Sequence, residues 1–262
     1  MRYAGLLFQS IAKHSLFIAF SFSAIAIGDV ASAATHSVPT STVKVDCATY
    51  GGGVKPGDRI ILMGPSRGPI SISNCSGTVS SPITVTNDSN AAGPLVVKHT
   101  SGGTMASCTD CEHVIIDGTG KWVGAPAGTC GANVDANKGG WVFGKTQCGI
   151  VLQCMTGAAK GLHLDGSTKH ITVKGVEIDG NFPTCTVGSG VFVNDHNYKL
   201  ADHPGQWREG IVLRNLYIHD SPGSGIYFGP NQNDEGAGDL QLRNNEIAYN
   251  YVDRSGCDGM KY

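Results

Sequence analysis

The chain has 262 residues, of which only 15% are charged and 37 are glycine, and its formal net charge is −2. This length fits one large β domain or two ordinary domains, and the glycine content fits many short strands joined by tight turns rather than a helical protein. A net charge this small does not by itself indicate a nucleic-acid partner or an acidic ligand, so we expect no nucleic-acid binding.

The N-terminus has the pattern of a secretory signal peptide. Arg2 and Lys13 precede an apolar run over 16–27, and the Ala-Ser-Ala sequence at 31–33 then offers a small-x-small cleavage site. An uncleaved membrane anchor is the alternative, but the apolar run is short for a membrane span. The pattern therefore predicts cleavage near Ala33.

Two segments follow from this interpretation. Residues 1–33 are the expected signal peptide, and residues 34–262 are the expected mature domain. We expect the domain to be secreted, extracellular or periplasmic, as a monomer without stable membrane insertion.

Nine cysteines in an exported chain indicate an oxidising compartment and several disulfides. Because nine is an odd number, at least one cysteine lacks a partner inside the chain. Cys108-Thr-Asp-Cys111 has zinc-like spacing, but no second pair and no histidine pair follows at a suitable distance. A disulfide or plain packing is therefore favoured over zinc there.

Short strands separated by turn residues are predicted through the first part of the mature region. They lie at 43–45, 56–62, 70–72, 82–86 and 94–98. Residues 119–147 are rich in glycine and contain Trp122 and Trp141. We expect a long loop or an irregular rung in that stretch.

A repeat dominates the rest of the chain, with copies at 113–118, 171–179, 211–219 and 240–248. The last three copies superpose without a gap. Each copy has two apolar positions one residue apart, then glycine or asparagine, then a second short apolar strand. One such unit cannot bury its apolar side alone, but stacked units can.

A second repeat, glycine-apolar-x-apolar, lies between the copies of the first. It occurs at 149–152, 161–164, 190–193, 225–228 and 259–262. The chain thus passes through three short strands per turn. Three parallel strands per turn predict an all-β fold, a right-handed parallel β-helix.

The alternation within the strands predicts which residues stack in the core. The expected stacks are Ile171 with Ile211 and Leu240, Val173 with Leu213 and Leu242, and Ile178 with Ile218 and Ile247. Gly175, Asn215 and Asn244 are expected at the bends, where glycine and asparagine best tolerate positive φ. Asn245 replaces an apolar residue, so we expect a side-chain ladder there or a bend shifted by one residue.

These features resemble a known family. The segment Leu240-Gln-Leu-Arg-Asn-Asn-Glu-Ile247 is similar to the repeat of pectate-lyase-like right-handed β-helix proteins. The lead-in Val54-Lys-Pro-Gly-Asp-Arg-Ile-Ile-Leu62, with Ser76-Gly-Thr78 and Ser81-Pro-Ile-Thr-Val85, resembles the N-terminal portion of the chondroitinase B and alginate lyase branch. The resemblance covers about 42–262.

The resemblance implies the fold more sharply than the chemistry. Such families include polysaccharide lyases, glycoside hydrolases, epimerases and proteins without demonstrated activity. The chain has no Arg-x-Pro-x-x-Arg pattern of pectate lyases and no Gly-His-Gly set of polygalacturonase-like hydrolases. Because the chain stops at Tyr262 in a glycine-led strand without a closing cap, we expect an N-terminal fragment of a longer protein. A partner or an uncapped natural end is the alternative.

The outward residues of the glycine-led strands form the candidate groove. They are His163, Phe192, Tyr227 and Lys261, with Val151 less securely placed. Such a column could bind sugars by stacking and deprotonate a substrate. The resemblance implies Lys261 as catalytic base with His163 as second choice and Tyr227 beside them. The alternative is an ordinary surface.

Calcium is the expected cofactor of this groove. Its candidate ligands are the flanking oxygens of Asp165, Asn194, Asp195 and Asp258. Trp207, in the loop over 194–210, is either a sugar platform or a plug that packs the loop onto the coil.

A basic column is predicted on another face, formed by Lys174, Arg214 and Arg243 on successive coils. These residues could grip an acidic polysaccharide. The alternative is exposed ion pairs of Lys174 with Glu177 and of Arg243 with Glu246, which contribute little.

Several polar residues follow the last isoleucine of each unit, where turn formation is the default. These residues are Asp117, Asp179, His219 and Asp220. Asp179 and Asp220 could still reach the groove. Asn133-x-Asp135-x-Asn137 resembles a calcium loop only in part, since Lys138 occupies its sixth position.

The sequence therefore predicts a secreted polysaccharide-active enzyme, a lyase that cleaves acidic glycans by β-elimination. Two alternatives stay open. One is a non-catalytic glycan-binding or adhesive surface β-helix, and the other is a β-helical glycoside hydrolase, which would carry suitably spaced carboxylates.

Overall fold

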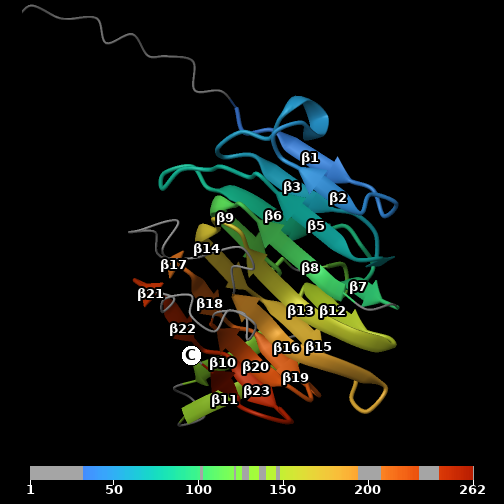
Figure 1. Ribbon diagram of the computed structural model, residues 1–262. Coiled ribbons are helices and arrows are strands. Elements are labelled where there is room, and N and C mark those ends of the chain that lie inside the picture. The colour runs from blue at the N-terminus through green and yellow to red at the C-terminus, as the bar shows by residue number, and fades with distance from the viewer. Residues whose placement is uncertain are drawn as a thin grey trace, which may run out of the picture. The chain divides into compact units, whose positions relative to one another are not determined.

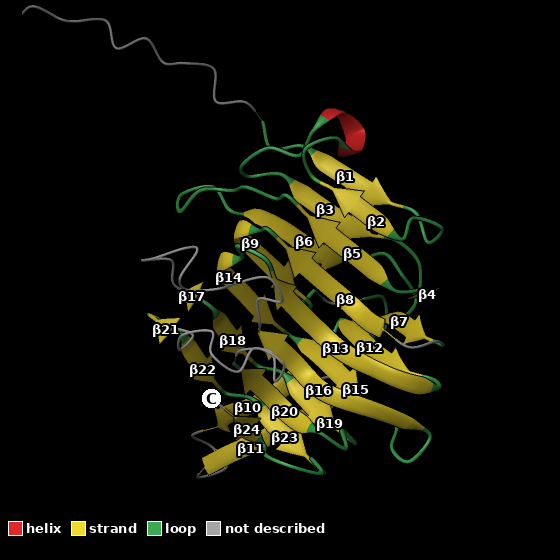
Figure 2. Ribbon diagram, viewed as in Figure 1, coloured by secondary structure: helices red, strands yellow, loops and turns green. Residues whose placement is uncertain are grey.

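The computed structural model describes residues 32–100, 103–120, 122–125, 130–135, 140–145, 148–193, 208–229 and 242–261 (Figure 1). The predicted signal peptide lies almost entirely outside these residues. Within them, helical structure is limited to the 3-10 turn η1 (Tyr50–Gly52), and no helix is long and apolar enough to cross a membrane. The rest of the regular structure is strand (Figure 2).

Three parallel sheets, which we call sheets A, B and C, make up the fold. Sheet A has the order β1 (Thr35–Val38), β3 (Arg59–Leu62), β6 (Ile83–Asn87), β9 (Glu112–Asp117), β14 (Lys169–Lys174), β18 (Val212–Arg214) and β22 (Glu246–Ala248). Sheet B has the order β2 (Lys44–Asp46), β5 (Ile70–Ser73), β8 (Gly103–Thr109), β13 (Gly157–Asp165), β16 (Cys185–Val193), β20 (Ser224–Phe228) and β24 (Met260–Lys261).

Sheet C has the order β4 (Ser66–Arg67), β7 (Leu95–His99), β12 (Ile150–Cys154), β15 (Val176–Asp179), β19 (Tyr217–His219) and β23 (Tyr251–Asp253). From β3 onward each turn visits sheet A, then sheet C, then sheet B, and neighbouring strands of one sheet come from successive turns. This order confirms the predicted right-handed parallel β-helix.

Among the described residues, two strand pairs lie outside the three sheets. β17 (Arg208–Glu209) pairs in parallel with β21 (Leu242–Arg243). β10 (Cys130–Asp135) and β11 (Gly140–Lys145) form an antiparallel hairpin between β9 and β12. The glycine-rich stretch 119–147, expected as a loop or an irregular rung, therefore holds a hairpin that branches out of the coil.

Inward-facing aliphatic residues form one continuous core. The first two members of each predicted stack are fully buried in successive coils: Ile171 and Ile211, which directly precedes β18, Val173 and Leu213, and Ile178 and Ile218. Each such side chain contributes about 1.5–3 kcal/mol when fully buried. The predicted core of the middle coils is therefore confirmed.

The third members of the stacks did not follow the prediction. Leu240 lies outside the described residues, and Ile247 and Leu242 were placed wrongly. Ile247 faces Leu213 in sheet A rather than Ile218. Val252 takes the predicted place of Ile247 beside Ile218. Leu242 belongs to the β17–β21 pair and not to sheet A.

The error has a physical cause in the two corners that flank sheet A. Asn215 follows β18 with φ +51°, and Asn244 follows β21, one corner earlier in the turn, also with φ +51°. Tyr249, with φ +58°, occupies the corner that Asn244 was expected to hold. At both corners a short strand is followed by one residue with positive φ. The two corners therefore have the same sequence pattern, and alternation alone does not tell them apart.

Two asparagines replace core residues in the last described coil. Asn245 Oδ1 accepts a hydrogen bond from Ile211 N at 2.8 Å, and its Nδ2 donates to Arg208 O at 3.0 Å. Asn250 bonds Leu216 N and Leu213 O in the same way, both at 2.9 Å. The expected ladder at Asn245 thus runs from side chain to backbone, so both amide groups are satisfied in a half-buried corner.

Eight of the nine cysteines form four disulfides. The pairs are Cys47–Cys75, Cys108–Cys111, Cys130–Cys148 and Cys154–Cys185. Cys257 is exposed and has no disulfide partner. The predicted odd cysteine is therefore confirmed, and Cys108 and Cys111 form a buried disulfide instead of half a zinc site.

Candidate functional site

The outer face of sheet B carries the predicted column of His163, Phe192, Tyr227 and Lys261. His163 lies opposite Phe192, Phe192 opposite Tyr227, and Tyr227 opposite Lys261, on four successive strands. The predicted alignment is therefore confirmed, while the roles of the four residues stay predictions. Val151 was grouped with them wrongly, because it lies in β12 of sheet C.

The aromatic rings of this column stack on one another. The centroids of Phe192 and Tyr227 are 5.1 Å apart, and their planes are 9° apart. His163 tilts against Phe192, with ring centroids 5.2 Å apart. Since the faces of Phe192 and Tyr227 are turned toward each other, the expected stacking of a sugar on those faces is not the mode this geometry favours. The ring edges, which carry partial positive charge, suit acidic groups better.

Two lysines flank the aromatic stack. Lys160 Nζ lies 4.0 Å from the ring centroid of Phe192, and Lys261 Nζ lies 5.8 Å from that of Tyr227. Burial lowers the pKa of Lys160, against the opposing effect of the Asp165 charge. We call the set of Lys160, Phe192, Tyr227 and Lys261 the lysine-aromatic column. A cationic group over a ring is itself stabilised by the ring quadrupole.

Sequence reasoning missed Lys160. It precedes the glycine-led segment by one residue, and β13 contains a register shift between Ala159 and Lys160. Simple alternation therefore does not place this side chain. Only one feature of the sequence pointed to Lys160, namely that it lies three residues before His163 in the same stretch.

Of the predicted calcium ligands, Asp165 and Asp258 lie far apart, and Asn194 lies outside the described residues. Asp165 ends β13, whereas Asp258 precedes β24, which lies three strands away in sheet B. Three strand spacings of about 4.8 Å and five residues of about 3.3 Å each separate them by on the order of 20 Å. Asp165 lies beside His163, 3.9 Å from its Nε2. Asp195 and Trp207 lie outside the described residues.

The predicted basic column holds only in part. Lys174 lies opposite Arg214. Arg243 lies in β21, opposite Glu209 of β17, and is therefore not in the column. The expected ion pairs also differ from those observed. Lys174 pairs with Asp117 at 3.0 Å, and Arg214 pairs with Glu246.

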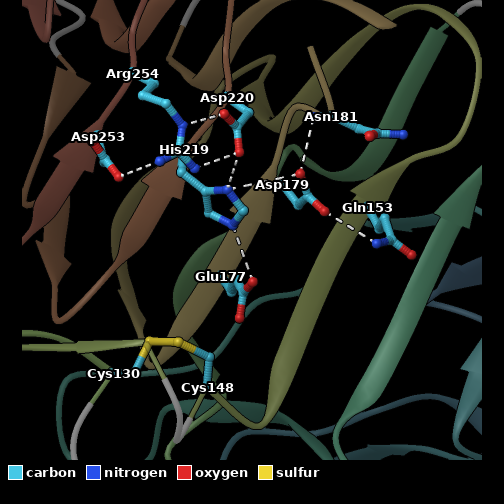
Figure 3. Close-up of polar contacts among 10 residues, drawn as sticks. All are labelled: Cys130, Cys148, Gln153, Glu177, Asp179, Asn181, His219, Asp220, Asp253 and Arg254. Carbon is cyan, nitrogen blue, oxygen red and sulfur yellow. Dashed lines mark hydrogen bonds and ion pairs between the residues drawn. A yellow bond between two sulfur atoms is a disulfide. The ribbon is translucent and has the colours of Figure 1, made fainter. Parts of the chain in front are cut away.

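A second polar cluster lies on the outer face of sheet C. His219 Nε2 is 3.1 Å from Glu177 Oε1, and its Nδ1 is 2.8 Å from Asp220 Oδ2 and 3.8 Å from Asp179 Oδ1 (Figure 3). Arg254, from the next coil, donates to both carboxylate oxygens of Asp220. We call this set the His219 cluster.

The cluster is held by further bonds at its rim. Gln153 Nε2 donates to Asp179 Oδ2 at 3.0 Å, and the backbone nitrogen of Asn181 donates to Asp179 Oδ1 at 2.9 Å. Arg254 Nη1 donates to Asp253 at 3.0 Å. The turn residues Asp179, His219 and Asp220 therefore gather, but on sheet C rather than in the sheet B groove.

Charges inside the cluster shift one another's titration. Burial lowers the pKa of His219, but its hydrogen bonds to Glu177 and Asp220 and the charge of Asp179 outweigh burial and raise that pKa above its usual range. The hydrogen bonds from Arg254 hold the pKa of Asp220 well below its usual range. His219 thus bridges carboxylates of two coils, which favour its protonated form.

The disulfide-closed hairpin packs beside this cluster. Cys130 and Cys148 form a small buried group with Tyr217, and Tyr251 packs against it. Tyr217 stacks on His219, with ring centroids 4.3 Å apart. A Cβ atom on Gly131 would lie 2.6 Å from the carbonyl carbon of Asn215, so the hairpin touches the corner that leads into sheet C.

Among the described residues, two groups place metal-ligating atoms together. One is Glu112 with His113 and His170, and the other is Asp179 with His219 and Asp220. Both include imidazole, whereas calcium takes oxygen ligands. Lys169 pairs with Glu112 at 3.2 Å, and Arg254 already pairs with Asp220. These sets do not fit the expected calcium ion.

Comparison of the chain with protein-family models, with curated proteins and with solved structures gives no match. The functional interpretation therefore rests on the geometry of the two outer faces.

Proposed function

We propose that the protein is a secreted β-helix that binds an acidic polysaccharide across the outer face of sheet B and cleaves it by β-elimination. The observation that carries this proposal is the lysine-aromatic column, in which ammonium groups flank an aromatic stack on successive coils. Four disulfides support the secreted location, because such bonds persist in oxidising compartments.

Binding follows from charge and spacing. Lys160 contacts the ring of β16, and Lys261 lies on β24, so the two ammonium groups are spread over several coils. An extended anionic chain that crosses these strands meets both groups, whereas one small anion meets one of them. Such repeated electrostatic contacts favour polyanions and weaken with salt.

The chemistry of β-elimination assigns roles to the same residues. A base removes the proton next to the uronic carboxylate, a cation neutralises that carboxylate, and an acid protonates the departing glycosidic oxygen. The lowered pKa of Lys160 makes it a better candidate for the base than a lysine of ordinary pKa. Tyr227 or His163 supplies the proton, and Lys261, three strands from Lys160 in sheet B, binds another carboxylate of the same polymer chain. This assignment exchanges the base expected from the sequence, Lys261, for Lys160.

The experiment separates binding from cleavage. The purified protein is incubated with alginate, chondroitin and pectate, with and without calcium, and the absorbance of the unsaturated product is followed. Affinity electrophoresis with the same polymers measures binding. The proposal expects binding to at least one polymer and product formation that calcium does not control.

Matched variants connect the result to the site. K160A is expected to abolish product while retaining part of the binding, and F182A changes an exposed aromatic residue on a loop outside the column as a control. Binding without product identifies a non-catalytic glycan-binding protein. New reducing ends without absorbance identify a hydrolase. Absence of binding to all three polymers contradicts the proposal.

A further inference from the structure

A buried carboxylate lies at the predicted cleavage point of the chain. Asp58 is only 4% exposed, and its Oδ1 accepts a hydrogen bond from the backbone nitrogen of Ala34 at 2.7 Å. Its Oδ2 accepts a hydrogen bond from Lys55 N at 2.8 Å and lies 3.0 Å from Nε2 of His36. A carboxylate withdrawn from water to this extent needs strong partners.

Ala34 is held on both sides of its peptide unit. Its carbonyl oxygen accepts from Arg59 N at 2.8 Å, and the next residue, Thr35, begins the β1–β3 ladder. Ser32 and Ala33, which precede it, are exposed. In the described part of the chain, the first strand, β1, therefore begins two residues after the Ala-Ser-Ala motif.

We propose that processing breaks the Ala33–Ala34 bond and that the new α-ammonium of Ala34 forms an ion pair with Asp58 that fixes the first coil. In this hydrolysis, water adds its oxygen to the carbonyl carbon of Ala33, which leaves as a carboxylate. The nitrogen of Ala34 keeps the electron pair of the broken bond and takes up protons to become an ammonium. The reaction requires a peptidase with preference for small residues and no other reagent.

The electrostatic reason is the difference between an amide and an ammonium. In the uncleaved chain Ala34 offers Asp58 one neutral N–H group. After cleavage Ala34 offers a full positive charge and two further N–H groups. Because Ala34 is exposed, these two groups can donate hydrogen bonds to water. Hydrogen bonds in which both groups are charged are shorter and stronger than those with a neutral donor.

Other groups around Asp58 agree with a cationic partner. Burial raises the pKa of Asp58, but hydrogen bonds from Lys55, His36 and Ala34 outweigh it and lower that pKa, so the carboxylate is charged at neutral pH. His36 is the one titratable side chain among the groups that bond to Asp58 in the described residues. The ammonium of Ala34 would supply a charge that does not depend on the protonation of His36.

The test is a double-mutant cycle that varies the N-terminal residue and the side chain at position 58. Four proteins are compared in urea unfolding at neutral pH: chains that begin at Ala34 or keep Ala33 before it, each with Asp58 or with D58N. Retaining Ala33 is expected to lower the folding equilibrium constant about fivefold with Asp58, since charged bonds exceed neutral ones by roughly 1 kcal/mol. With D58N the extension is expected to have no effect.

The control is D46N, which alters a half-buried carboxylate on β2 that bonds Ala48 and Asn74. In the D46N background, retaining Ala33 should still lower the folding equilibrium constant. If D58N does not fold, the pKa of the Ala34 amine is measured by NMR in the native protein and should exceed its ordinary value of about 8. An equal cost in both backgrounds, an unshifted amine, or an exported protein whose first residue is not Ala34 overturns the proposal.

Discussion

Sheets B and C present opposite kinds of outer face on the same coils. On sheet C, His219, Arg254 and their carboxylates bond one another, so the charges compensate inside the protein. On sheet B, the ammonium groups of Lys160 and Lys261 lie against aromatic rings. The difference teaches that the charges of sheet C bind one another across coils, whereas the lysines of sheet B lie at an aromatic surface that suits an acidic ligand.

Removing His219 should produce the largest effect, on stability rather than on binding. H219A leaves Glu177, Asp179 and Asp220 close together without the imidazolium, and breaking a buried pair costs about 3 kcal/mol. We expect a loss of about 2–3 kcal/mol in the free energy of unfolding, measured with urea at pH 6. H113A, which removes a histidine stacked on His170 at another corner, should cost less. An equal loss in both variants would show that the His219 cluster has no special role.

Removing the two lysines should have the opposite signature. K160A combined with K261A should lower the affinity for an acidic polysaccharide by about fivefold, because two partly exposed charge contacts contribute roughly 1 kcal/mol together. The free energy of unfolding should change little. K174A is the matched control, since Lys174 is already paired with Asp117 on sheet A. Equal weakening by K174A would mean that only net charge matters.

The raised pKa of His219 predicts a stability that falls in alkali. A histidine with a raised folded pKa contributes fully below its unfolded pKa of about 6.5, and the contribution is lost as pH rises through the folded pKa. Thermal unfolding of the native protein and of H219A, followed between about pH 5 and pH 9, measures this contribution. Their difference should shrink as the pH rises, and a constant difference would contradict the assignment.

His99 predicts the reverse dependence with a smaller amplitude. This side chain is 3% exposed at the end of β7, and burial lowers its pKa. Its contribution is present above about pH 6.5 and is lost as the pH falls through the folded pKa. H99L should therefore reduce the loss of stability in acid, as judged by thermal unfolding. Unchanged acid sensitivity would point to other groups.

The fold could be predicted because a β-helix repeats its constraints. Alternation of apolar residues, glycine at the glycine-led strands and a left-handed residue at the corners identified three strands per turn. The same repetition caused the error at Leu242 and Ile247, since the corner at Asn244 and the corner at Asn215 have the same local pattern. Only the packing of the last coil on its neighbour distinguishes them, and that information is not local.

The candidate site was predicted less completely. The column of His163, Phe192, Tyr227 and Lys261 follows from register alone. Lys160 depends on an irregularity in β13, which alternation does not reveal. The His219 cluster joins residues of three coils, and its members were assigned to turns because each residue alone has ordinary turn chemistry.

The most direct test of the central claim is an NMR titration with an acidic oligosaccharide. Ring signals of Phe192 and Tyr227 and the Nζ signals of Lys160 are followed together with the ring of His219. The account predicts saturable shifts on the sheet B signals while His219 stays unchanged. Shifts at His219 with none at Phe192 and Tyr227 would place the ligand on sheet C and contradict the proposed function.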